Sequence, residues 1–189
     1  MDLAAYLAAT SRMAIPHLIA ALGLVVSERA GLINIGVEGT MLTGAFAAFA
    51  VAYYTNNYWL GLLAGMLAGC FMSLIFAVAA IRFRPPQVVI GCAITLLGSG
   101  FTAVLFRKMF FDAQTGGTQV TPFPPIQIPG LSSIPFIGEV FFQHNVIVYI
   151  GFILVPAIWF LMNRTSIGTR IIAVGEHPKA ADSLGINVF

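Results

Sequence analysis

The chain contains no Asp, Glu, Lys or Arg between Glu38 and Arg82, and this uncharged stretch is the feature that most limits how it can fold. Charged residues make up only 8% of the sequence, and the mean hydropathy is +0.93. A soluble surface needs about 25–35% charged residues. The composition therefore excludes a water-soluble globule and predicts a chain surrounded by lipid. The net charge of +2 comes from few groups, so it gives no indication of nucleic-acid binding.

The apolar runs are long enough for membrane-spanning helices, each of which takes about 20 residues. Polar and aromatic residues at 53–59 divide the uncharged stretch into two spans joined by a hairpin. The runs are apolar on all faces, which favours helices over the alternating strands of a membrane barrel. We therefore predict an all-α, polytopic membrane helical bundle of about five transmembrane helices. Within a transmembrane domain of residues 1–162, the predicted spans are 13–27, 40–54, 59–81, 88–106 and 143–162.

The basic residues predict the orientation of these spans, because cytoplasmic loops carry an excess of Lys and Arg. One side of the membrane would carry Arg29, Arg82, Arg84, Arg164, Arg170 and Lys179, and the other only Arg12, Arg107 and Lys108. We therefore expect an external N-terminus and a cytoplasmic tail. Residues 107–142 are rich in proline and glycine, which predicts an external loop. This loop either receives a partner or only covers the helix bundle.

We predict that residues 163–189 form a cytoplasmic segment. Within it, the pattern at 177–185 predicts one short helix. Pro178 would lie in its first turn and Gly185 just past its end, with Ala180, Ala181 and Leu184 on one face. A helix this short is not stable alone and needs a surface to lie on.

The residue types exclude several functional classes. The three histidines lie in separate segments, and the sequence has no HExxH or CxxC spacing, so we predict no enzyme activity, no metal and no cofactor. Both lysines follow Arg107 or Pro178, so the chain has no GxxxxGK[ST] phosphate-binding loop. Any ATP would have to be hydrolysed by another chain.

Two of the predicted spans carry small or polar residues at helical spacing. Gly61, Gly65 and Gly69 predict a face on which another helix packs closely. The fourth span carries a second face of glycines and hydroxyls: Gly91, Thr95, Gly98, Ser99 and Thr102. Its hydroxyls either line a route for a polar solute, through Thr95, Ser99 and Thr102, or bond to their own or a neighbouring helix.

The stretch ERAGLINIGVEG, residues 28–39, lies between two apolar runs and is rich in helix breakers. Transporters expose backbone groups to substrate where a membrane helix is broken in this way, which makes Asn34 and Glu38 candidate solute contacts. Alternatively the stretch is a cytoplasmic loop, with Glu38 in the first turn of the next helix. Physical reasoning from the residues alone favours the loop.

Residues 27–48, SERAGLINIGVEGTMLTGAFAA, resemble a characteristic segment of bacterial ATP-binding cassette (ABC) importer permeases for nucleosides and simple sugars. This family belongs to the superfamily that includes ribose and branched-chain amino acid permeases. Residues 164–188, RTSIGTRIIAVGEHPKAADSLGINV, are similar to the family's cytoplasmic coupling segment, and 85–102 and 128–139 also fit. The chain departs from the family at Thr95, where many members carry Asn. It also ends at Phe189, where members continue with further spans, so it looks like the N-terminal part of a permease.

The resemblance implies a permease subunit that moves a nucleoside or simple sugar across the bacterial cytoplasmic (inner) membrane. Its implied partners, besides the lipid bilayer, are an ATP-binding cassette subunit, an extracytoplasmic solute-binding (lipo)protein and a second permease subunit. The residues implied in coupling to the ATPase are Gly175, Glu176, Pro178, Ala180, Ala181, Asp182 and Gly185. The alternatives are an ATP-independent channel or carrier, or a truncated remnant that does not transport.

Overall fold

The computed structural model describes residues 3–83, 85–110, 123–127, 140, 142–186 and 188. They form two compact units, one made of 1–31 with 123–188 and the other of 32–122. Helices dominate both units, which confirms the predicted all-α fold. By length and composition, four of the described helices could cross a membrane, in the ranges Ala5–Arg29, Tyr58–Phe83, Gln87–Phe110 and Val146–Arg164.

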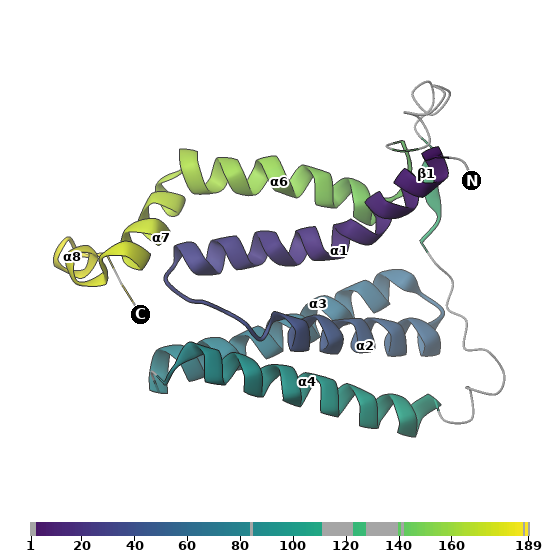
Figure 1. The fold of residues 1–189 in the computed structure, drawn as a ribbon, viewed down its shortest axis with the longest axis horizontal. Helices are drawn as coiled ribbons and strands as arrows, with labels where there is room; N and C mark the ends of the chain where they lie inside the picture. The colour runs from purple at the N-terminus through teal and green to yellow at the C-terminus, as the bar shows by residue number, and fades with distance from the viewer. Residues whose placement is uncertain are drawn as a thin grey trace. The chain divides into compact units, whose positions relative to one another are not determined.

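The first unit is built on α1 (Leu3–Arg29) and α6 (Val146–Arg164), which lie side by side and run in the same direction (Figure 1). Ile15 and Val148 are both buried at 3% exposure. The helices approach closely at Gly151, where a Cβ atom would lie 3.0 Å from Cγ2 of Ile15. Because α1 begins at Leu3, it extends well before the predicted start at residue 13.

Two short strands precede α6. β1 (Pro125–Gln127) pairs antiparallel with β2 (Gln143–Asn145), with Ile126 opposite His144. The His144 side chain is 1% exposed, and its Nε2 lies 2.8 Å from the carbonyl oxygen of Val140. The predicted helical start at 143 is therefore wrong, because 143–145 form a strand pair. Most of the predicted external loop 107–142 lies outside the described residues.

Two helices follow α6 in the segment predicted to contain one. α7 (Ser166–Glu176) is absent from the predicted elements, whereas α8 (Pro178–Ser183) is the short helix expected there. α8 ends in a Schellman motif, because the Ile186 N–H donates to the Ala181 carbonyl at 3.1 Å and the Gly185 N–H to the Asp182 carbonyl at 2.9 Å. Gly185 has the positive φ of +77° that this motif requires.

The second unit contains α2 (Val37–Thr55), α3 (Tyr58–Val78) and α4 (Gln87–Phe110). The predicted hairpin joins α2 to α3 through Asn56, which has φ of 50°, and Asn57, whose Oδ1 accepts from the Trp59 N–H at 2.9 Å. α3 continues as a π-helix, η1 (Ala79–Phe83), which ends before the two prolines of the sequence, Pro85 and Pro86. α4 lies beside α2 and runs in the same direction (Figure 1).

The described helices differ from the predicted spans at two further places. α2 is not among the four helices apolar enough to span a membrane, because it is rich in Ala, Gly, Thr and Tyr and carries Glu38. α4 includes Arg107 and Lys108, which the prediction placed in the external loop. The helix extends to Phe110 because this ring, 1% exposed, packs against Phe49. Basic residues in a last turn also interact favourably with the helix dipole.

Candidate functional site

One side-chain hydrogen bond joins the chain between α1 and α2 to the start of α4, and another lies within this segment. The Ile33 N–H donates to Oε1 of Gln87 at 2.7 Å, and the Gly36 N–H donates to Oδ1 of Asn34 at 3.0 Å. Part of the hydrogen-bonding capacity of the half-buried Asn34 is thus used within the segment. Glu38 lies exposed in the first turn of α2. In this arrangement 30–36 form turns and coil between two separate helices.

The backbones of α2 and α4 touch at paired glycines. A Cβ atom on Gly39 would lie 2.5 Å from the Ile94 carbonyl oxygen, and one on Gly98 would lie 2.5 Å from the Gly39 carbonyl oxygen. Gly36, just before α2, and Gly91 make a similar contact nearer the start of both helices, at 2.9 Å. Any side chain at these positions would push the helices apart, so glycine is required for this approach.

α2 packs on its other neighbour, α3, through two of the three glycines singled out in the sequence. A Cβ atom on Gly61 would lie 2.7 Å from the Ala48 carbonyl oxygen, and one on Gly65 would lie 2.9 Å from the Gly44 carbonyl oxygen. The space beside Gly69 is open in the described structure.

The hydroxyls of α4 donate to carbonyls of their own helix. Thr95 donates to Gly91 at 3.1 Å and Ser99 to Leu96 at 3.1 Å. The buried Thr102 lies 2.7 Å from the Gly98 carbonyl oxygen. These bonds match the second alternative given above, in which the hydroxyls bond to their own helix and do not line a solute route. Their oxygen lone pairs are still able to accept a hydrogen bond.

A groove of about 420 Å³ lies between α2 and α4. Its lining includes Phe46 and Phe49 from α2, together with Ser99, Thr102 and Phe106 from α4. Two of the predicted solute-route residues thus share this groove, whereas Asn34, Glu38 and Thr95 are not part of its lining. The sequence prediction missed the three phenylalanines. Their helical spacing was the available signal, but apolar residues on every face of these helices obscured it.

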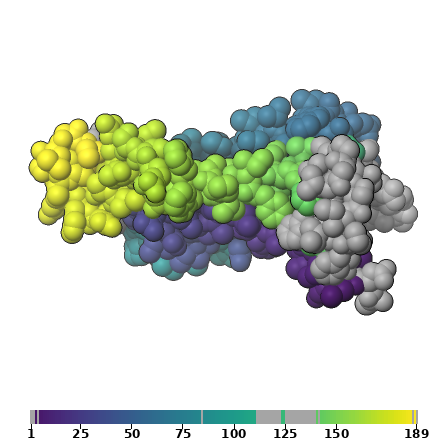
Figure 2. Space-filling view, turned by 90° about the horizontal axis from the view of Figure 1, so that it is seen from above, coloured from purple at the N-terminus to yellow at the C-terminus, as the bar shows by residue number. Residues whose placement is uncertain are grey.

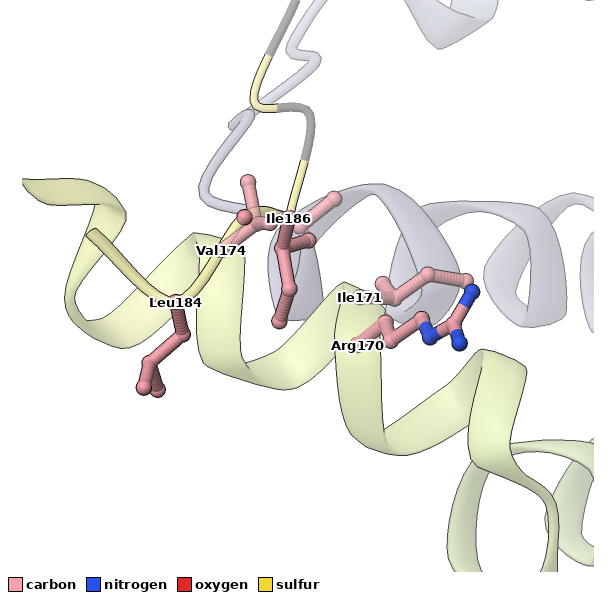
Figure 3. Close-up of a pocket in the computed structure, with 7 residues that line it drawn as sticks. Arg170, Ile171, Val174, Leu184 and Ile186 are labelled. Atoms are coloured by element: carbon pink, nitrogen blue, oxygen red, sulfur yellow. The ribbon is translucent and has the colours of Figure 1, made fainter. Parts of the chain in front are cut away.

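A second hollow, of about 630 Å³, lies at α7 and α8. Figure 3 shows Arg170, Ile171 and Val174 on α7, and Leu184 and Ile186 on the chain that follows α8. The space-filling view shows the atoms of α7 and α8, in yellow-green and yellow, as one continuous surface (Figure 2). Leu184 is 80% exposed, so this surface carries an exposed apolar side chain.

α7 packs closely against the ends of the two long helices of its unit, and glycines lie at both contacts. A Cβ atom on Gly175 would clash with the backbone of Arg29 and lie 2.9 Å from the Gly31 nitrogen, at the end of α1. A Cβ atom on Gly168 would clash with the Leu161 and Met162 carbonyls, near the end of α6. α7 therefore contacts both α1 and α6 directly.

Around α8, the predicted coupling residues divide by exposure. Ala181 is 2% exposed, so it lies on the buried side of α8 and not on its outer surface. The outer surface is formed by Glu176, Pro178, Ala180, Asp182 and Gly185. The predicted shared face of Ala180, Ala181 and Leu184 is wrong, because only Ala181 is buried.

A model of the family described as "Branched-chain amino acid transport system / permease component" matches residues 6–189. The chain belongs to this permease family. It is 44% identical over 191 residues to the guanosine ABC transporter permease protein NupQ of Bacillus subtilis, covering 96% of this chain and 59% of that protein. It is 32% identical over 181 residues to the nucleoside ABC transporter permease protein NupC of Lactococcus lactis, covering 92% and 56%.

The glucose ABC transporter permease protein TsgB13 of Haloferax volcanii is 27% identical over 187 residues, covering 92% of this chain and 48% of that protein. The chain therefore spans only about half to three fifths of the length of these relatives. No solved structure matches it. Membership in the permease family, together with the apolar helices, makes the chain a multi-pass membrane protein.

Proposed function

We propose that the chain provides the membrane-spanning permease part of an ABC importer that moves a nucleoside or simple sugar, driven by a separate ATPase subunit. The match to the permease family over 6–189 carries this proposal, because it includes both the 27–48 segment and the α7–α8 segment. Relatives named for guanosine, nucleosides and glucose support the two solute classes.

In this proposal the α7–α8 segment is the cytoplasmic surface on which the ATPase subunit docks. The exposed Leu184 and the neighbouring outer residues of α8 would contact the partner, while the buried Ala181 holds α8 in place. Motion would pass from α8 to α7, and from α7 to α1 and α6 through the backbone contacts of Gly175 and Gly168. Contacts without intervening flexible side chains transmit displacement as a rigid element does.

The remaining partners and the orientation complete the proposal. The N-terminus would lie outside the bacterial cytoplasmic membrane, where an extracytoplasmic solute-binding protein delivers the solute, and the tail would lie inside. A second permease subunit would complete the route across the membrane. On this chain the route would follow the α2–α4 face, with Asn34, Glu38, Thr95, Ser99 and Thr102 as solute contacts.

The test is reconstitution of the complete transporter containing this chain, its ATPase subunit and its binding protein in lipid vesicles. We expect uptake of guanosine or glucose that depends on ATP and on the ATPase subunit. Uptake without the ATPase would identify an ATP-independent carrier. Failure to take up either solute would favour a chain that does not transport.

The docking surface is tested with Leu184→Asp, because a charge there should remove an exposed apolar contact. We expect this variant to lose co-purification with the ATPase by about tenfold or more, the effect of 1.4 kcal/mol in binding. Leu3→Asp is the matched control, since Leu3 is also an exposed leucine, at 62%, but lies at the start of α1 and not in the α7–α8 segment. Equal losses in both variants would argue against this docking surface.

A further inference from the structure

The groove between α2 and α4 has a lining that suits one chemical class within the proposed solutes. Three phenylalanine rings line it, from Phe46, Phe49 and Phe106, and its polar side chains are Ser99 and Thr102. We propose that this groove binds the base of a nucleoside during transport, with the base stacked on Phe46 and its N–H groups donating to the hydroxyl oxygens. This inference rests on the proposed permease function and specifies its solute.

Two of the three phenylalanines that line the groove pack against other aromatic rings, and the third does not. Phe49 and Phe106 lie 6.0 Å apart between ring centroids, and both pack against the buried Phe110 at 5.2 Å. Phe46 makes none of the ring contacts found among the described residues. Phe46 is half-buried and lines the groove, which makes it the ring on which a planar ligand would stack, and a nucleobase stacks on an aromatic side chain regardless of base identity.

The hydroxyls determine the polarity of the ligand. Ser99 donates to the Leu96 carbonyl, and Thr102 lies within hydrogen-bonding distance of the carbonyls of Gly98 and Ser99, at 2.7 and 3.2 Å. With their hydrogens used in this way, either hydroxyl can take part in a further hydrogen bond only as an acceptor. A matching ligand therefore donates hydrogen bonds from one edge, as the amino and ring N–H groups of a nucleobase do.

The same lining is poorly suited to a free sugar. Every hydroxyl of a sugar gives up hydrogen bonds to water on entering an apolar groove, and the two acceptors available could replace few of them. A base exposes two apolar faces and has its polar groups on an edge. The volume of about 420 Å³ is within the usual range for small-molecule sites. A lipid chain would fill the apolar part but would have no use for the acceptors.

The experiment measures ATP-driven guanosine and glucose uptake by the complete transporter in lipid vesicles, normalised to assembled complex. Phe46→Leu keeps an apolar side chain but removes the ring, so we expect maximal guanosine uptake to fall about tenfold, the equivalent of 1.4 kcal/mol. Phe46→Trp should restore uptake, because it returns a stacking face. Phe101→Leu is the matched control, since Phe101 is exposed on the same helix as Ser99 but does not line the groove.

A second variant, Ser99→Ala, removes one acceptor and should lower guanosine uptake even if Phe46→Leu fails to assemble. Unchanged guanosine uptake in Phe46→Leu, or in Ser99→Ala when Phe46→Leu does not assemble, would overturn the base site. Failure of Phe46→Trp to restore guanosine uptake would also overturn the base site. Uptake of glucose but not guanosine by the unmodified transporter would overturn the base site and leave the proposed function standing. Uptake of neither solute would overturn both.

Discussion

Single glycines set the distance between neighbouring helices in this protein. At Gly39 and Gly98 the backbones of α2 and α4 are so close that a methyl group on either residue would meet a carbonyl oxygen at 2.5 Å. Gly100 lies on the same helix as Gly98 but has open space where its Cβ would be. Two glycines on one helix therefore differ in whether the structure has room for a side chain.

We predict that Gly98→Ala destabilises the protein by about 1–3 kcal/mol, the usual range for overpacking a close contact. Gly100→Ala is its matched control and should be neutral or slightly stabilising, because alanine favours helix. Thermal unfolding in detergent, followed by circular dichroism, measures both midpoints. A Gly98→Ala midpoint as high as that of Gly100→Ala would show that the helices are not in backbone contact.

Gln87 provides a second test at the residue scale, because its Oε1 accepts the Ile33 N–H at 2.7 Å. Gln87→Leu should release this N–H, at a cost of about 1 kcal/mol. Gln87→Glu keeps an acceptor oxygen and should protect the Ile33 amide. Hydrogen–deuterium exchange of the peptide containing Ile33 distinguishes the two variants. Equally slow exchange in both would mean that Gln87 does not hold the segment.

At the scale of elements, α8 depends on its ends and on the surface beneath it. It spans only Pro178–Ser183 and starts with proline. Its C-terminal Schellman bonds require the left-handed conformation of Gly185. Ala181 is buried against the rest of its unit. This explains how so short a helix persists, since one buried side chain and a defined stop replace the stability that length would supply.

Gly185→Ala should therefore fray α8, because a residue with a Cβ in the left-handed region costs roughly 1–2 kcal/mol. We expect weaker coupling, seen as lower uptake per ATP hydrolysed by the complete transporter, with membrane insertion unchanged. Gly185→Asn is the comparison, because asparagine tolerates this conformation better and should retain more coupling. Normal coupling in Gly185→Ala would contradict a role for this helix end.

At the scale of the whole molecule, the permease assignment makes topology the property to establish first. Counting α2 as a fifth crossing, as in the five predicted spans, we expect the α2–α3 hairpin to lie outside the membrane and α8 to lie inside, from the distribution of Lys and Arg. The two cysteines, Cys70 and Cys92, are free in the structure, so replacing them with serine breaks no disulfide. A background without cysteine is therefore available for labelling.

In that background, Asn56→Cys should react with a membrane-impermeant maleimide on intact cells, because Asn56 is exposed at the hairpin. Lys179→Cys, exposed on α8, should react only after the membrane is opened. Each variant is the control for the other. The reverse labelling pattern would invert the proposed orientation and place the α7–α8 surface out of reach of a cytoplasmic ATPase.

Local residue patterns were sufficient to predict much of the helical framework. The polar and aromatic residues at 53–59 predicted the hairpin inside the uncharged stretch, and Asn56 and Asn57 form its turn. Pro178 and Gly185 likewise marked the ends of α8. These features depend on neighbours in the sequence. α7 was missed because it depends partly on a segment far away in the sequence, where Gly175 packs against the backbone of Arg29 and Gly31.

An apolar helical bundle in lipid follows from the sequence alone, because lipid admits only helices and closed barrels, and runs that are apolar on every face exclude the alternating strands of a barrel. The role of each small or polar residue depends instead on the partner against which it packs. Gly61 and Gly65 contact α2 while Gly69 faces open space, and Ser99 and Thr102 meet three phenylalanine rings in one groove. In a helix that is apolar on every face, periodicity cannot indicate which face meets a neighbour; only the packed partner does.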